Sequence, residues 1–144
     1  MKNPVFRERV TPNLASYLLP VLAGLGFTAV FIPLIGEAAI AIGVTALIAV
    51  LALQILLSPV VTITEAHLTI GRAKIERIHL GSAEVFAGES KREVLGVHLD
   101  ARSYLRLQGS APQVVRVEVV DKNDPAPYWI FSTRRGDEIL AALA

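Results

Sequence analysis

The stretch that decides the fold is residues 14–57, which reads LASYLLPVLAGLGFTAVFIPLIGEAAIAIGVTALIAVLALQILL. It contains two uncharged apolar runs, Leu14–Ile35 and Ala38–Leu57, separated only by Gly36 and Glu37. As an α-helix, each run is about 30 Å long, the thickness of the hydrocarbon core of a bilayer. A soluble protein of 144 residues has no interior that holds two such helices. The sequence therefore predicts a membrane protein whose first partner is the lipid bilayer.

The charges that flank the two runs predict their orientation. Lysines and arginines gather on the outer flanks, whereas the turn between the runs carries only Glu37. The positive-inside rule then places both termini in the cytoplasm and makes the chain a multi-pass protein of the plasma membrane. Gly36 is expected to take the positive φ that ends a helix, so the two helices should run antiparallel. The flanking cations are Lys2, Arg7, Arg9, Arg72, Lys74 and Arg77.

Small side chains recur along one face of the second run at spacings of three and four residues. In lipid, such residues let two helix backbones approach closely. We expect this row to pack against Ala23, Gly24 and Thr28 of the first run; the alternative is a homodimer or a contact with another membrane protein. Neither run contains an ionisable residue, which excludes the usual chemistry of a transporter or proton pathway. The row comprises Ala38, Ala41, Thr45, Ala49 and Ala52.

Residues 58–144 have the composition of one small globular domain, preceded by an arm over residues 1–13 and the helical pair over 14–57. Short β-branched runs alternate with turn residues, and Val115, Val117 and Val119 alternate with charged residues as in a half-buried strand. We expect an antiparallel β-rich domain closed by a C-terminal helix. Its element order is similar to a pleckstrin-homology-like domain, with a two-layer α+β sheet as the alternative. The expected strands are 60–64, 68–70, 75–80, 83–86, 104–107, 114–120 and 128–131, with helical segments at 90–95 and 137–143.

Several function classes are not supported by the sequence. The formal net charge is +1, which gives no basic excess for nucleic-acid binding. The chain has no Cys, and the spacing of His67, His79 and His98 matches no zinc motif. It also lacks a Gly-x-Ser-x-Gly elbow and a glycine-rich phosphate loop. We therefore expect no catalytic residues, no metal site and no cofactor.

Three segments carry a family resemblance. They are Asp100–Leu105, Val115–Val119 and Asp124–Arg135, the last of which reads DPAPYWIFSTRR. Together with the Arg7-Glu8-Arg9 arm and the two apolar runs, they resemble a family of uncharacterised actinobacterial membrane proteins, catalogued only as a domain of unknown function. The resemblance implies a location and a lineage but no reaction.

Two groups of residues are candidates for binding. Arg134 and Arg135 stand just before the last helix, where cations oppose the helix dipole. They are expected either to pair with Asp100, Asp121 or Asp124, or to bind an anion together with Arg102.

Tyr128 and Trp129 should point to opposite faces of their strand, with one ring in the core. The alternative is a membrane-interface anchor or a peptide groove. We therefore expect a non-enzymatic, membrane-anchored interaction module of the inner leaflet, with an anionic-lipid or anionic-ligand binder as the alternative.

Overall fold

The computed structural model describes residues 4–144, so Lys2 of the predicted arm lies outside it. The chain forms two compact units. One, the hairpin unit, is Pro12–Ser58. The other, the β domain, combines Pro59–Ala144 with the residues that precede Pro12. The β domain is therefore built from both sides of the hairpin.

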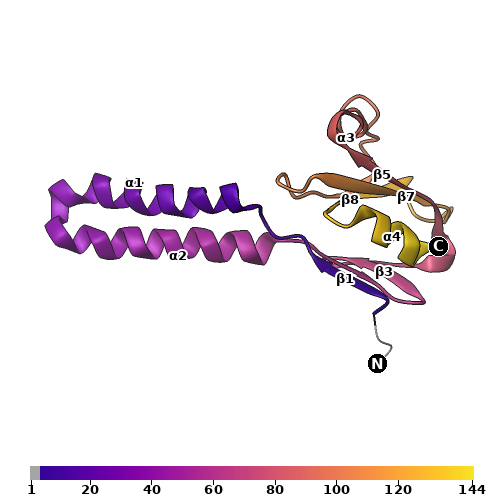
Figure 1. Cartoon of the computed structure of the whole chain (residues 1–144), viewed down its shortest axis with the longest axis horizontal. Coiled ribbons are helices and arrows are strands. Elements are labelled where there is room, and N and C mark those ends of the chain that lie inside the picture. Colours follow the sequence, from indigo (N-terminus) through magenta and orange to yellow (C-terminus); the bar gives the residue numbers. More distant parts are fainter. Residues whose placement is uncertain (1–3) are drawn as a thin grey trace. The chain divides into compact units, whose positions relative to one another are not determined.

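The hairpin unit consists of two helices joined by a tight turn (Figure 1). A 3-10 turn, Leu14–Tyr17, leads into α1 (Leu18–Ile35), and a second one, Gly36–Ala38, leads into α2 (Ala39–Leu57). Gly36 has φ 60°, as predicted for the residue that ends α1. The most apolar 18-residue window within Leu14–Leu57 has a mean hydropathy of 2.7, and by length and composition this region is apolar enough to cross a membrane.

Two glycines bring α1 and α2 into contact. Gly24 and Gly43 are buried, and a Cβ atom added to Gly43 would overlap Thr28 Oγ1. The Thr28 hydroxyl donates to Gly24 O at 2.9 Å, so it is satisfied within its own helix. At the open end of the hairpin, Gln54 Nε2 donates to Ser16 O at 3.0 Å. Of the three residues expected on α1, Gly24 is buried, and Ala23 and Thr28 are half-buried.

The row of small residues on α2 does not make this contact. Ala39 and Gly43 form the buried face instead, because glycine allows the closest approach of the two backbones. The expectation of packing within the hairpin is thus wrong for the row itself, which the structure leaves exposed: Ala38, Ala41, Thr45, Ala49 and Ala52.

The first sheet of the β domain has the strand order β1-β2-β3-β4, and all its pairs are antiparallel. Its strands are β1 (Phe6–Arg9), β2 (Val60–Ile63), β3 (His67–Ile70) and β4 (Ala73–Glu76). The strand β1 comes from the predicted arm, and Arg9 lies opposite Val60. The arm is therefore part of the domain, since its alternating residues Phe6, Glu8 and Val10 are buried.

The second sheet has the order β5-β7-β8-β6. A 3-10 turn at Arg77–His79 interrupts the predicted strand 75–80, because the chain passes there from the first sheet to the second. The strand β6 runs parallel to β8, a departure from the expected antiparallel arrangement, and β8 lies between β6 and its antiparallel partner β7. The strands are β5 (Leu80–Ala87), β6 (Tyr104–Arg106), β7 (Gln113–Val119) and β8 (Tyr128–Thr133); α3 is Gly88–Leu95 and α4 is Gly136–Leu143.

The two sheets and α4 share one hydrophobic core. Side chains of both sheets meet Ile139 of α4, and Figure 1 shows this helix, in yellow, between the sheets. A smaller cluster of Val94, Val114 and Ile130 lies beneath α3. Fully buried members of the main core are Val10, Val61, Ile63, Leu68, Ile70, Val115, Val117, Phe131 and Ile139.

The glycine contact gives a testable prediction for the hairpin. Replacing Gly43 with Ala forces α1 and α2 apart and should lower the free energy of unfolding by about 1–3 kcal/mol, the usual cost of overpacking. The matched control is Gly26→Ala, where an added Cβ meets nothing within 4 Å. Denaturant titration of the full chain in detergent micelles measures both variants. Equal losses for the two would contradict the assignment of the contact.

Candidate functional site

The arginine pair at the start of α4 does not bind the aspartates that the sequence suggested. The guanidinium of Arg135 donates to both carboxylate oxygens of Glu138, with Nε 2.7 Å from Oε1. This hydrogen bonding lowers the pKa of Glu138 and raises that of Arg135. The same guanidinium lies over the ring of Phe6, 4.9 Å from its centroid. Glu138 thus offsets the unfavourable cation at the helix start.

Arg134 faces the beginning of the chain. Its backbone N–H donates to Glu8 Oε1 at 2.9 Å, and its Nη2 donates to Thr11 O at 3.0 Å. The neighbouring Thr133 hydroxyl donates to Glu8 Oε2 at 2.6 Å and accepts the N–H of Arg135 at 2.9 Å. Both carboxylate oxygens of Glu8 are therefore occupied by the segment that joins β8 to α4.

Glu8 is the residue whose role the sequence analysis missed. Its side chain is buried, with 8% of the residue exposed, and it belongs to the arm rather than to the predicted domain. The sequence did contain a sign of this burial. Over residues 6–10, Phe6, Glu8 and Val10 alternate with two arginines, which is typical of a strand with one buried face. The Arg7-Glu8-Arg9 and Ser-Thr-Arg-Arg segments, far apart in sequence, are in direct contact.

Arg102 lies away from the arginine pair. Its Nη2 donates to Asp100 Oδ2 at 2.9 Å, and hydrogen bonding by Arg102 lowers the pKa of Asp100 from 3.8 to about 2. The N–H of Asp100 donates to the hydroxyl of Tyr128, at the first residue of β8, whereas Arg134 follows the last. A six-residue strand spans roughly 17 Å at the usual rise. The three arginines therefore do not converge on one anion.

The aromatic pair occupies both faces of β8. Trp129 is buried in the main core, where its ring lies 4.7 Å from that of Tyr104. Tyr128 packs against the smaller cluster under α3, and its hydroxyl donates to His98 O at 3.1 Å. Core packing accounts for both rings, and Tyr128 adds a hydrogen-bonded polar tip, so a membrane anchor or a peptide groove has no support from this pair.

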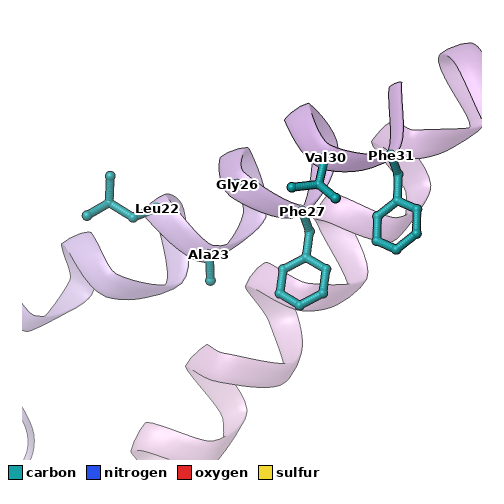
Figure 2. Close-up of a pocket in the computed structure, with 6 residues that line it drawn as sticks. All are labelled: Leu22, Ala23, Gly26, Phe27, Val30 and Phe31. Atoms are coloured by element: carbon teal, nitrogen blue, oxygen red, sulfur yellow. The ribbon is translucent and has the colours of Figure 1, made fainter. Parts of the chain in front are cut away.

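Two apolar recesses lie on the hairpin unit. One, of about 310 Å³, is formed by α1 alone, and Figure 2 shows Phe27 and Phe31 projecting to the same side of this helix. The other, of about 460 Å³, combines Phe27 with three residues of the small row, Ala41, Thr45 and Ala49, and with Ile42 and Ala46. Thr45 donates to Ala41 O at 2.8 Å, so its hydroxyl needs no hydrogen-bond acceptor from a molecule bound in the recess. Both recesses suit an apolar partner.

The part of the chain that the structure describes shows no cluster of side chains suited to metal binding or catalysis. Within residues 4–144, no group of three or more His, Cys, Asp or Glu side chains is placed to hold a metal ion. Of the histidines, His79 lies 4.0 Å from Asp121 through Nδ1. Acyl transfer needs a nucleophile that is hydrogen-bonded to a base, and a third group that orients the base. The interactions recorded within residues 4–144 include no such arrangement.

Comparison with known proteins identifies a family and nothing more specific. A family model described as a protein of unknown function (DUF3093) matches residues 5–143. No curated protein matches the chain, and no solved structure does. The likeness to pleckstrin-homology-like domains therefore stays a prediction. The match runs through the arm, the hairpin unit and α4, which agrees with a domain built from both sides of the hairpin.

The buried carboxylate gives a prediction for the β domain. Replacing Glu8 with Gln exchanges one acceptor oxygen for an N–H₂ group that faces the donors Thr133 and Arg134. An unsatisfied buried group of this kind costs about 1–3 kcal/mol, and we expect that loss in the free energy of unfolding. Arg7→Gln, at the exposed neighbour in β1, should change it by less than about 0.5 kcal/mol.

Denaturant titration in micelles, followed through the fluorescence of Trp129, reports on the β domain alone because Trp129 is the single tryptophan of the chain. If Glu8→Gln and Arg7→Gln unfold at the same denaturant concentration, the carboxylate does not hold the arm to the end of β8.

Proposed function

Because the chain belongs to the DUF3093 family, whose function is unknown, its role has to be inferred from its own geometry, and we propose that it is a non-enzymatic, membrane-anchored interaction module. In this proposal α1 and α2 cross the plasma membrane as two spans. The β domain lies at the inner leaflet, where it positions the hairpin and meets a partner. We further propose that the two spans, the Asp124–Arg135 segment and an actinobacterial origin are common to the family.

The observation that carries the proposal is the bare apolar surface of the hairpin unit. Apart from the glycine contact, large aliphatic side chains point outward along the whole length of both helices, and only 6% of the most apolar window is buried. A surface of this size is not left facing water in a soluble monomer. Lipid satisfies it without any further partner. Examples on both helices are Leu18, Leu25, Val30, Leu34, Val44, Ile48, Leu53 and Leu56.

The charges support one orientation. Arg7, Arg9 and Arg72 flank the open end of the hairpin in sequence, and the closed end carries Glu37. Cations are retained on the cytoplasmic side, so both termini and the β domain should be cytoplasmic.

Cysteine labelling tests this orientation, since the chain has no Cys of its own. A single Cys at Glu37 should react with a membrane-impermeant maleimide in intact cells. A single Cys at the exposed Lys122 of the β domain should react only after permeabilisation. Both variants should stay in the membrane pellet after carbonate washing. Release by carbonate, or labelling of the Lys122 position in intact cells, would overturn the proposed anchoring or its direction.

The recess around Thr45 favours an apolar helix as the partner. Its floor is made of small side chains that the hairpin does not use, and an incoming helix packs best on such a surface. The helix would come from another membrane protein or from a second copy of this chain. An anion site made of Arg102, Arg134 and Arg135 is less favoured, because Arg135 is paired with Glu138 and Arg102 lies at the other end of β8.

Cross-linking in native membranes tests the helix partner. Thr45→Cys, labelled with a bifunctional reagent, should give a discrete adduct, whose mass is twice 15.5 kDa if the partner is a second copy. The control is Leu25→Cys, an exposed position of α1 outside the recess, which should give no discrete adduct. Equal adducts at both positions, or none at Thr45, would remove the recess as a contact surface.

A further inference from the structure

The point where the chain passes between the β domain and the hairpin unit is tightly defined within the β domain. Arg9 lies opposite Val60, and the N–H of Val10 donates to Pro59 O at 2.9 Å. Only Ser58 and Pro59 separate Leu57 of α2 from Val60 of β2. Since an extended chain advances at most about 3.6 Å per residue, Val60 stays within about 11 Å of the end of α2. Covalent connection alone thus keeps this end of the β domain close to the end of the proposed span.

Four arginines from four separate segments surround this junction. Arg9 is the last residue of β1, and Arg72 lies in the β3–β4 turn beside Gly71, whose N–H donates to Val60 O at 2.9 Å. Arg106 is the last residue of β6, and its Nε lies 3.6 Å from the place that a Cβ atom would take if one were added to Gly71. Arg134 donates to Thr11 O, as described above. We call these four residues the basic collar.

Among the described residues, no carboxylate forms an ion pair with the side chain of a collar arginine. Glu8, next to Arg9 in sequence, is buried with both oxygens occupied by Thr133 and Arg134. Within residues 4–144, the structure records no ion pair for Arg9, Arg72 or Arg106, and Arg9 and Arg72 are exposed. The acidic turns at Glu65, Glu76, Asp121 and Asp124 lie at the opposite ends of the strands. Asp137 and Glu138 follow Arg134 in the first turn of α4, where Glu138 is paired with Arg135.

We propose that the basic collar binds the phosphates of anionic phospholipid headgroups and so seats the β domain on the inner leaflet. This inference rests on the proposed membrane anchoring. The cytoplasmic leaflet carries a negative surface potential that attracts Arg and Lys side chains near it. Guanidinium groups suit phosphate because they donate two parallel hydrogen bonds. The hairpin would hold the collar beside the headgroups and so raise their effective concentration, which means that no single contact needs a high affinity of its own.

The test uses the full chain in lipid nanodiscs of phosphatidylcholine, alone or with increasing phosphatidylglycerol. A dye is attached to a single Cys at the exposed Leu107, next to Arg106, and its quenching by aqueous acrylamide reports whether the collar faces water. We expect quenching to fall as phosphatidylglycerol is added, and to recover at high salt because the interaction is electrostatic. In neutral discs the dye should remain accessible at all salt concentrations.

The double variant Arg9→Gln/Arg72→Gln should weaken docking by about fivefold for each arginine removed. The control pair, Arg102→Gln/Lys122→Gln, removes the same net charge from positions outside the collar and should dock like the wild type. Equal quenching of the wild type in neutral and anionic discs, or an equal loss in both variant pairs, overturns the collar. Failure of the wild type to enter either disc overturns the membrane anchoring as well, and the two failures are thereby distinguished.

Discussion

The β domain depends on a carboxylate that is buried near the beginning of the chain. Glu8 has left water, which is costly for a charged group unless hydrogen bonds replace its hydration. The Thr133 hydroxyl and the Arg134 N–H provide those bonds. Both groups lie at the end of β8, 125 and 126 residues after Glu8. This requirement holds β1 in the first sheet and fixes the start of α4 against it. Arg135 extends the same connection through Phe6.

The hairpin unit obeys the opposite constraint. It contains no ionisable side chain inside either helix, and the hydroxyls of Thr28 and Thr45 donate to carbonyls of their own helices. Gln54 Nε2 donates to Ser16 O, while Gln54 Oε1 is buried without a hydrogen-bond partner among the described residues. Such local hydrogen bonding of the hydroxyls suits the proposed bilayer, where an unsatisfied polar group is costly. The contact between the helices is made by Gly24 and Gly43, where backbone can touch backbone. Close packing and local hydrogen bonding thus stabilise the hairpin unit, whereas burial stabilises the β domain.

Local patterns in the sequence were sufficient for most elements. The length of the two apolar runs predicted α1 and α2, and the alternation of valines over 114–120 predicted β7 nearly to the residue. Contacts between distant residues were not accessible in this way. The strand β1 has the alternation of a half-buried strand over only four residues, and its pairing with β2, beyond the hairpin, is a contact that this alternation does not predict. Arg135 pairs with Glu138 rather than with a distant aspartate, because one turn of helix brings the two together. Gly43 lies two positions from both Ala41 and Thr45, which is more than half a turn of helix, so the small row faces away from the contact. Spacing alone does not tell which of the two faces meets α1.

Placing β1 before the hairpin and β2 after it has a consequence for how the protein is made. The ribosome releases β1 first, and its edge stays without a partner until both apolar helices and then β2 have been synthesised. Glu8 stays without its partner for longer still, until Thr133 has been synthesised. The β domain therefore completes its fold only after both intervening helices have been made. A chain whose hairpin stalls during synthesis keeps an open strand edge and an unpartnered carboxylate, and an open edge is a template for pairing with another chain.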